Sequence, residues 1–137
     1  MKHISRILIF AAAISVGTAQ AQLAVTVLPV KVTGQKAVVK LTMKNELADK
    51  VESARAVCFV LDEQGRMVGQ STKWVIGGMK ERPALEPKKT ATFNFVVTSP
   101  QPFTTTNLTA KISFSRVVLA NGQTVDVNKE VEIKSAR

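Results

Sequence analysis

Apolar and polar residues alternate with a period of two along most of the chain. In residues 36–44, for example, Val39, Leu41 and Met43 alternate with lysine and threonine, which predicts a strand with one buried and one solvated face. Polar breaks that contain glycine or proline separate such segments, and no segment has a convincing helical period. The pattern therefore predicts strands at residues 23–32, 36–44, 53–62, 67–76, 90–97, 108–119 and 123–134.

Seven short strands separated by turns favour an all-β fold in which two sheets pack face to face. We expect a seven-stranded immunoglobulin/fibronectin-like β-sandwich, with an up-and-down barrel as the alternative. The connections at 77–89 and 98–107 are long, whereas a simple meander needs only tight turns. We therefore expect the chain to cross between the sheets at both places. Pro29 cannot donate a ladder hydrogen bond, so it places the first strand at an edge or at a switch between sheets.

The last two strands are predicted to form a closing hairpin. Asn121-Gly122 separates them, and an Asn-Gly pair between two alternating segments is the strongest short-range hairpin signal. Ile112 and Phe114 would then face the final strand across the core, at Val127, Val131 and Ile133.

The third strand is apolar on both faces, which is typical of a strand in the middle of a sheet. One face carries Val57, Phe59 and Leu61, and the other carries Ala54, Ala56, Cys58 and Val60. We assign the second row to the outside of the sandwich. A neighbouring strand or loop would cover this row, or another chain would dock on it.

The first 21 residues have the features of a cleavable signal peptide. Lys2 and Arg6 precede an apolar run at 7–16, and Ala-Gln-Ala at 19–21 has the small-x-small pattern that signal peptidase requires. The run has ten residues, whereas a membrane-spanning helix needs roughly 20. We therefore expect cleavage after residue 21, no membrane span, a single domain at 22–137, and a periplasmic or secreted location in a bacterium.

The residues left after cleavage are basic and poor in reactive side chains. Loss of Lys2 and Arg6 lowers the net charge from +9 to +7, and His3, the only histidine, is lost with them. Histidine is the usual general base and the commonest metal ligand, and residues 22–137 contain no hydrolase, phosphate-loop or metal-ligand motif. We expect a protein that is not an enzyme and that has no catalytic, cofactor-binding or metal-binding residues.

Cys58 is the only cysteine, so the chain cannot form an intramolecular disulfide. Its apolar neighbours favour a buried thiol that packs as a small hydrophobic side chain. An exposed thiol that joins two chains is the alternative.

Residues 59–69 resemble the FxLYD-type domain, a bacterial extracytoplasmic immunoglobulin-like sandwich. The family's F-x-L strand corresponds to FVL at 59–61, which leads through the acidic turn DEQG at 62–65 into a strand with VG at 68–69. Residues 85–93 are similar to the family's entry into a middle strand, with Lys88 in place of the usual glycine. The resemblance spans about residues 36–134, and it implies a sandwich fold and a mostly non-catalytic role.

Basic residues in the connection 77–89 are the candidate binding site. Lys80, Arg82, Lys88 and Lys89 concentrate there, and Trp74 lies at the end of the preceding strand. The basic residues either form a solvated surface or contact an anionic partner, such as acidic polysaccharide, lipid headgroups or an acidic protein. Trp74 either spans the core or, with partial exposure, anchors an interface.

These features favour a binding or structural module that acts through its loops and sheet edges on a protein or on an anionic component of the cell envelope. Nucleic acid is not an expected partner, because export separates the chain from it and interleaved aromatic residues are absent. The alternative function is an accessory or chaperone-like subunit of an envelope complex, which would act by β-strand augmentation.

Overall fold

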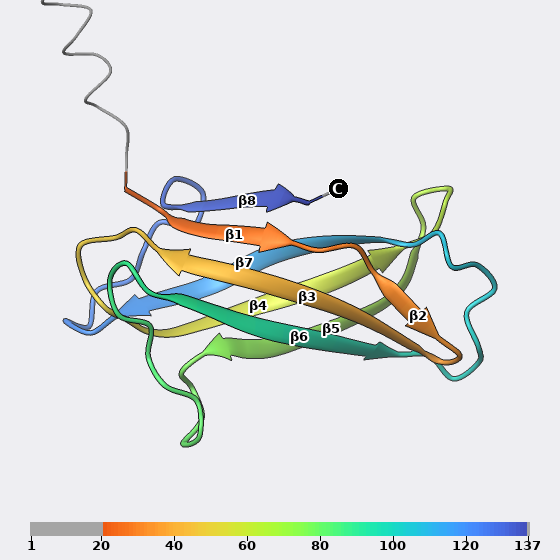
Figure 1. Cartoon of the computed structure of the whole chain (residues 1–137), viewed down its shortest axis with the longest axis horizontal. Coiled ribbons are helices and arrows are strands. Elements are labelled where there is room, and N and C mark those ends of the chain that lie inside the picture. The colour runs from red at the N-terminus through yellow and green to blue at the C-terminus, as the bar shows by residue number, and fades with distance from the viewer. Residues whose placement is uncertain (1–20, 137) are drawn as a thin grey trace, which may run out of the picture.

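The computed structural model describes residues 21–136, which form two β-sheets packed face to face (Figure 1). All regular structure in these residues is strand, which confirms the all-β sandwich predicted from the sequence. No helix within residues 21–136 is long and apolar enough to cross a membrane. The signal-peptide prediction lies, apart from Ala21, outside the described residues. The strands are β1 (Leu23–Val27), β2 (Lys31–Thr33), β3 (Lys36–Asn45), β4 (Val51–Leu61), β5 (Met67–Ile76), β6 (Thr90–Thr98), β7 (Thr109–Leu119) and β8 (Val131–Ser135).

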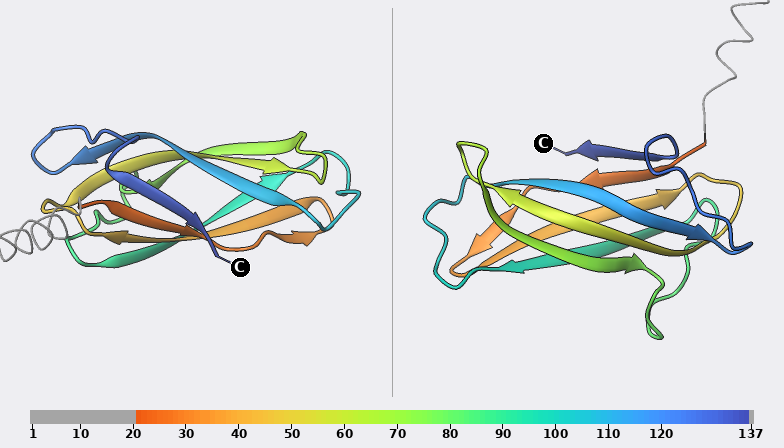
Figure 2. Two further views of the ribbon diagram at one scale, coloured as in Figure 1. Left: turned by 90° about the horizontal axis from the view of Figure 1, so that it is seen from above. Right: turned by 180° about the vertical axis from the view of Figure 1, so that it is seen from behind.

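The two sheets differ in width. Sheet A contains β8, β1, β3 and β6 side by side in that order, and β2 continues the line of β1 along β3. Sheet B contains three strands in the order β5-β4-β7. β1 and β8 run parallel, and all other paired strands run antiparallel. Sheet A lies in front of sheet B in Figure 1, and Figure 2 shows the two layers from above and from behind.

Side chains from the inner faces of both sheets form one apolar core. Val39, Leu41 and Met43 of β3 have no exposed surface, as their alternation predicts. On β6, Phe95 is buried in the same core, whereas the adjacent Val96 is 45% exposed on the outer face. Burial of a large apolar side chain contributes about 1.5–3 kcal/mol to stability, so this inner layer is the main source of the stability of the fold.

The long connections cross between the sheets, as predicted. Residues 77–89 lead from β5 of sheet B to β6 of sheet A, and residues 99–108 lead from β6 back to β7 of sheet B. The shorter connection from β3 to β4 also crosses. It follows Asn45, the last residue of β3, which is polar but has no exposed surface.

The first predicted strand is two strands in the structure, so the described residues contain eight strands rather than seven. The break is at Leu28-Pro29-Val30. Leu28 still donates its backbone N–H to the carbonyl oxygen of Lys40 at 2.9 Å, so both halves follow β3. Proline has no N–H to donate and fixes its own φ, which explains why the strand is interrupted there.

The predicted closing hairpin is wrong. The turn itself forms, because Leu119 donates to the carbonyl of Gln123 at 2.8 Å and Gly122 adopts a φ of 89°. After Val125 the chain leaves β7 and crosses to sheet A, where β8 runs parallel to β1. An Asn-Gly pair determines only the local turn. The strand with which β8 pairs depends instead on the apolar surface of β1, about 100 residues earlier.

The two faces of β4 are the reverse of the prediction. The row that faces the core, with no exposed surface, consists of Ala54, Ala56, Cys58 and Val60. The proposal that another chain docks on this row is therefore wrong. The bulkier row is half-buried on the outer face between β5 and β7, and consists of Val57, Phe59 and Leu61. Sheet A supplies large inner side chains such as Leu41 and Phe95, so the smaller row of β4 fits opposite them.

Candidate functional site

Trp74 lies near the end of β5, outside the buried core. Its strand partner is Arg55 on β4, and the guanidinium carbon of Arg55 lies 5.6 Å from the centroid of the Trp74 ring. The indole is half-buried, whereas the next two residues, Val75 and Ile76, are buried in the core. The interpretation of Trp74 as a tryptophan that spans the core is therefore wrong, and the alternative, a partly exposed ring, is correct.

Arg82 connects the loop after β5 to both sheets. Its guanidinium donates a hydrogen bond to the backbone carbonyl oxygen of Trp74, and its Cζ lies 4.7 Å from the ring centroid of Phe93 on β6. The loop makes a turn at this point, since the N–H of Arg82 donates to the carbonyl of Met79 at 3.1 Å. Two arginines are thus held against two aromatic rings, one pair on sheet B and one at the edge of sheet A.

These side chains surround a hollow of about 510 Å³. Its lining contains three cationic side chains and no carboxylate, and consists of Arg55, Thr72, Lys73, Trp74, Met79, Arg82, Phe93 and Asn94. An arginine has five N–H donors, so a guanidinium group that lies over a ring can still donate to the oxygens of a carboxylate or a phosphate.

A fourth cation extends the same surface. Arg116 on β7 is the strand partner of Arg55, so two like charges lie opposite each other across β4 and β7. Such a pair destabilises a sheet when no counter-ion is present. Within residues 21–136, no carboxylate oxygen lies within 4.0 Å of the charged nitrogens of Arg55, Lys73, Arg82 or Arg116. We call Arg55, Lys73, Arg82 and Arg116, with Trp74 and Phe93, the basic-aromatic site.

The structure separates the four basic residues predicted in the connection 77–89. Lys88 forms an ion pair with Glu46, in which Nζ lies 3.1 Å from Oε1. Nζ of Lys44 lies 3.3 Å from Oε2 of the same carboxylate. The hydrogen bond from Lys88, followed by that from Lys44, holds the pKa of Glu46 below its usual value. The charge of Lys88 is therefore compensated locally.

The other three residues lie along the loop. Arg82 belongs to the basic-aromatic site, and it also lines a second hollow of about 440 Å³ with Lys89, Glu81 and Glu86. Lys80 is exposed. Arg55, Arg116 and Phe93 were not predicted as site residues, because they lie on three different strands that no local motif brings together. Lys73 was not predicted either, although it directly precedes Trp74.

Cys58 is buried in the core with no exposed surface, which confirms the expectation of a packed thiol. Burial raises the pKa of the thiol to about 11, so the reactive thiolate is disfavoured. The structure therefore contradicts an exposed thiol that joins two chains. Across residues 21–136, histidine, cysteine and acidic side chains form no group of three or more that could hold a metal ion.

No family model matches the chain, and a search of curated proteins gives no match either. The resemblance to the FxLYD-type domain therefore stays a prediction.

Proposed function

We propose that this protein is an exported, non-enzymatic binding module that contacts an anionic component of the bacterial envelope through the basic-aromatic site. The observation that carries the proposal is a group of four cations that form no ion pair within 4.0 Å in the described residues, three of them around one hollow. An anion placed there would relieve the repulsion between Arg55 and Arg116.

The two arginines that lie over aromatic rings support binding of carboxylate or phosphate groups in particular. Contact with an aromatic ring restricts the motion of a guanidinium group, so less conformational entropy is lost when the group donates hydrogen bonds to an anion. The cations lie on β4, β5 and β7 and on the 77–89 loop, so a ligand with several anionic groups would contact more of them than a single small anion. We therefore expect an anionic polymer or surface to bind more tightly than free acetate or phosphate.

The proposal is tested with two triple variants of equal charge. In the site variant, Arg55→Gln, Lys73→Gln and Arg116→Gln are combined. In the control variant, Lys36→Gln, Lys40→Gln and Lys129→Gln remove three exposed cations that do not line the hollow. Both variants lose three positive charges, so any difference in their binding depends on where the removed cations lie and not on the total charge.

The measurement is the salt concentration that elutes each protein from immobilised polygalacturonate, together with sedimentation with phosphatidylglycerol vesicles. We expect the site variant to elute at lower salt than the control variant and to sediment less. Equal shifts for both variants would show that only net charge matters, and the proposed site would be abandoned.

A further inference from the structure

The two edges of the sandwich, where the sheets end, differ in how closely the edge strands of the two sheets approach each other. On one side, β5 and β6 approach so closely that a Cβ on Gly69 would lie 2.6 Å from Cγ1 of Val97. On the other side, β8 pairs with β1 and β7 pairs with β4, and within residues 21–136 no strand pairs with the outer edge of β7 between Thr109 and Arg116. Sheet A is four strands wide here, and sheet B has three.

A core-facing side chain is left uncovered as a result. Ile133 on β8 is the strand partner of Val25, and residues paired in this way point to the same side of the sheet. Val25 is 1% exposed, but Ile133 is 38% exposed. Isoleucine at an inner position of a sandwich is normally covered by the opposite sheet, so the strand that would cover Ile133 is absent from the described chain.

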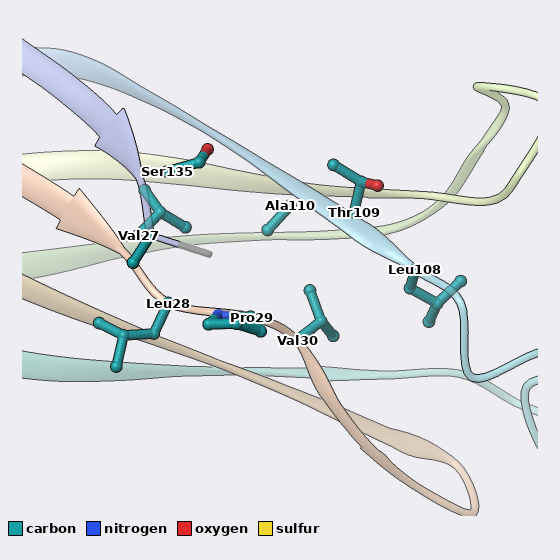
Figure 3. Close-up of a pocket in the computed structure, with 9 residues that line it drawn as sticks. Val27, Leu28, Pro29, Val30, Leu108, Thr109, Ala110 and Ser135 are labelled. Carbon is teal, nitrogen blue, oxygen red and sulfur yellow. The ribbon is translucent and has the colours of Figure 1, made fainter.

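The space beside β7 consists of two adjoining hollows. One, of about 460 Å³, is lined by Val27, Ala110, Ile112 and Ile133 among others. The second, of about 360 Å³, lies between the β1-β2 break and the start of β7, where Figure 3 shows Val27 to Val30 opposite Leu108 to Ala110. Both linings are mostly apolar and neither contains a carboxylate. We call this space the β7-β8 groove.

We propose that an extended segment of a partner protein, with apolar side chains at alternate positions and acidic side chains between them, adds to the edge of β7 as the fourth strand of sheet B. Backbone groups of β7 would pair with the segment, and its apolar side chains would cover Ile133 and Ala110. The acidic side chains are inferred from charge, because Lys111 is exposed on β7 and lines the groove, whereas no acidic residue lines it.

A second copy of the chain fits the groove less well. Pairing of β7 with another β7 would bring Lys111 and Arg116 close to the same cations of the copy. The inner side chains of that second strand, Ile112 and Phe114, are already buried in their own core, so they would not cover Ile133. An acidic, extended partner meets both requirements. It also gives the accessory-subunit function a specific surface, the β7-β8 groove.

The probe is a synthetic eight-residue peptide of alternating valine and glutamate, capped at both ends. Amide hydrogen exchange of the protein is followed by NMR with and without the peptide. We expect exchange at residues 109–115 to slow by about tenfold or more at saturation, with no comparable change on β5 or β6. A peptide in which every glutamate is replaced by lysine should bind at least about tenfold more weakly, and a peptide N-methylated along one edge should not slow exchange.

Two protein variants test the groove itself. Ile133→Glu places a charge where the apolar side chains would pack, and it should weaken binding by about tenfold or more. Lys111→Glu should reverse the preference between the glutamate and lysine peptides. Both positions are exposed, so both variants are expected to keep the far-UV circular dichroism spectrum of the wild type.

Three results would overturn the proposal. The first is absence of slowed exchange at 109–115 with the glutamate peptide at millimolar concentration. The second is equal binding of the lysine peptide. The third is slowed exchange at β7 that depends on protein concentration without any peptide, which would identify the occupant as a second copy. Ile133 and Lys111 do not belong to the basic-aromatic site, so unchanged peptide binding in their variants would count against the groove alone.

Discussion

Gly78 lies against the indole of Trp74 so closely that a Cβ on Gly78 would be 2.5 Å from both Cγ and Cδ2 of the ring. Its φ of 74° is in the left-handed region, which side chains other than glycine rarely adopt. The loop after β5 can therefore fold over Trp74 only with glycine at this position. Gly78 and Arg55 both lie against the indole, so they restrict the position of the Trp74 ring in the basic-aromatic site.

Replacement of Gly78 by alanine should displace the loop or the indole. We expect Gly78→Ala to lower the free energy of unfolding by about 1–3 kcal/mol and to shift the fluorescence maximum of Trp74 to longer wavelength. Gly34→Ala is the matched control, because its φ is 61° but its Cβ would have no atom within 4 Å. The control should lose only about 1 kcal/mol and keep the native fluorescence. Equal losses of unfolding free energy for the two variants in urea, with unchanged fluorescence in both, would contradict the close packing of Gly78 against Trp74.

Asn45 should be the most sensitive polar residue of the fold. Its Nδ2 donates to the carbonyls of Asp49 and Leu85 at 3.0 Å each, and its Oδ1 accepts from the N–H of Leu47 at 2.9 Å. Asn45→Ala would leave buried backbone groups without partners, and we expect a loss of about 2–4 kcal/mol in urea unfolding. Asn94→Ala, at an exposed site on β6, should change stability by no more than about 0.5 kcal/mol. Similar values for the two variants would be inconsistent with a buried hydrogen-bond network at Asn45.

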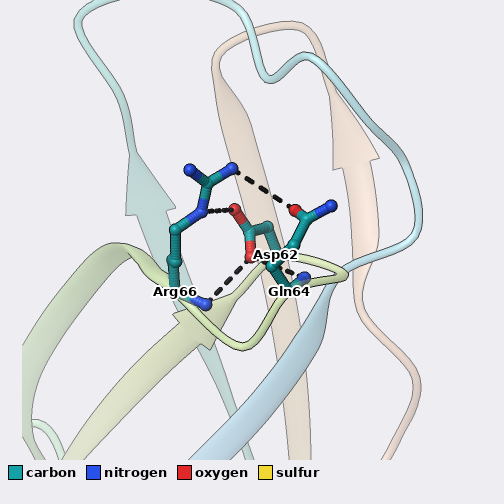
Figure 4. A network of polar contacts seen from close by, with 3 residues as sticks. All are labelled: Asp62, Gln64 and Arg66. Atoms are coloured by element: carbon teal, nitrogen blue, oxygen red, sulfur yellow. Dashed lines mark hydrogen bonds and ion pairs between the residues drawn. The ribbon is translucent and has the colours of Figure 1, made fainter.

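The turn between β4 and β5 should make stability depend on pH through Asp62. Its carboxylate accepts hydrogen bonds from the N–H groups of Gln64 and Arg66 at 2.9 Å each, and from Nε of Arg66 at 3.0 Å (Figure 4). The backbone hydrogen bond from Arg66 is the largest cause that holds the pKa of Asp62 below its usual value, and the Arg66 guanidinium adds to it.

A carboxyl group whose pKa is lower in the folded protein stabilises the fold above its unfolded pKa of about 3.9, and this stabilisation is lost as the pH falls through the folded value. Asp62→Asn, which has no charge to titrate, should therefore be less stable than the wild type at about pH 7 and nearly equal to it well below about pH 3. Arg66→Gln keeps the backbone donors and should retain most of the pH dependence. The measurement is urea unfolding across this pH range, and a difference between wild type and Asp62→Asn that does not vary with pH would refute the prediction.

Cys58 should be unreactive in the folded protein. The thiol has no exposed surface and a pKa of about 11, so neither access nor thiolate formation favours reaction. We expect no labelling by 5,5′-dithiobis(2-nitrobenzoate) at about pH 8 without denaturant, and complete labelling of one thiol in concentrated urea. Rapid labelling of the native protein would contradict the assignment of Cys58 to the core.

The sequence predicted those parts of the fold that short-range patterns determine. Alternation alone identified β3 and β6, and the acidic glycine turn identified the β4-β5 hairpin. The faces of β4 were not predictable, since both of its rows are apolar and the choice depends on the size of the side chains in sheet A. The parallel pairing of β8 with β1 was not predictable either, because it joins segments about 100 residues apart.

The candidate site was predicted only in part for the same reason. Trp74 and Arg82 are close in sequence and were identified, whereas Arg55 and Arg116 meet only because β4 pairs with β7. Lys88, which a charge count places in the site, is compensated by Glu46, a residue 42 positions earlier. Charge patterning locates basic residues, but strand pairing decides which of them lie close together in the fold.

Trp74 is the only tryptophan, so its fluorescence reports directly on the basic-aromatic site. The decisive measurement is a titration of wild type, site variant and control variant with oligogalacturonate, followed by this fluorescence. We predict a saturable fluorescence change in the wild type and in the control variant, and we expect added salt to weaken it. The change should be absent from the site variant, in which Arg55, Lys73 and Arg116 are replaced by glutamine. No change in the wild type, or the same titration curve in all three proteins, would contradict anion binding at this site.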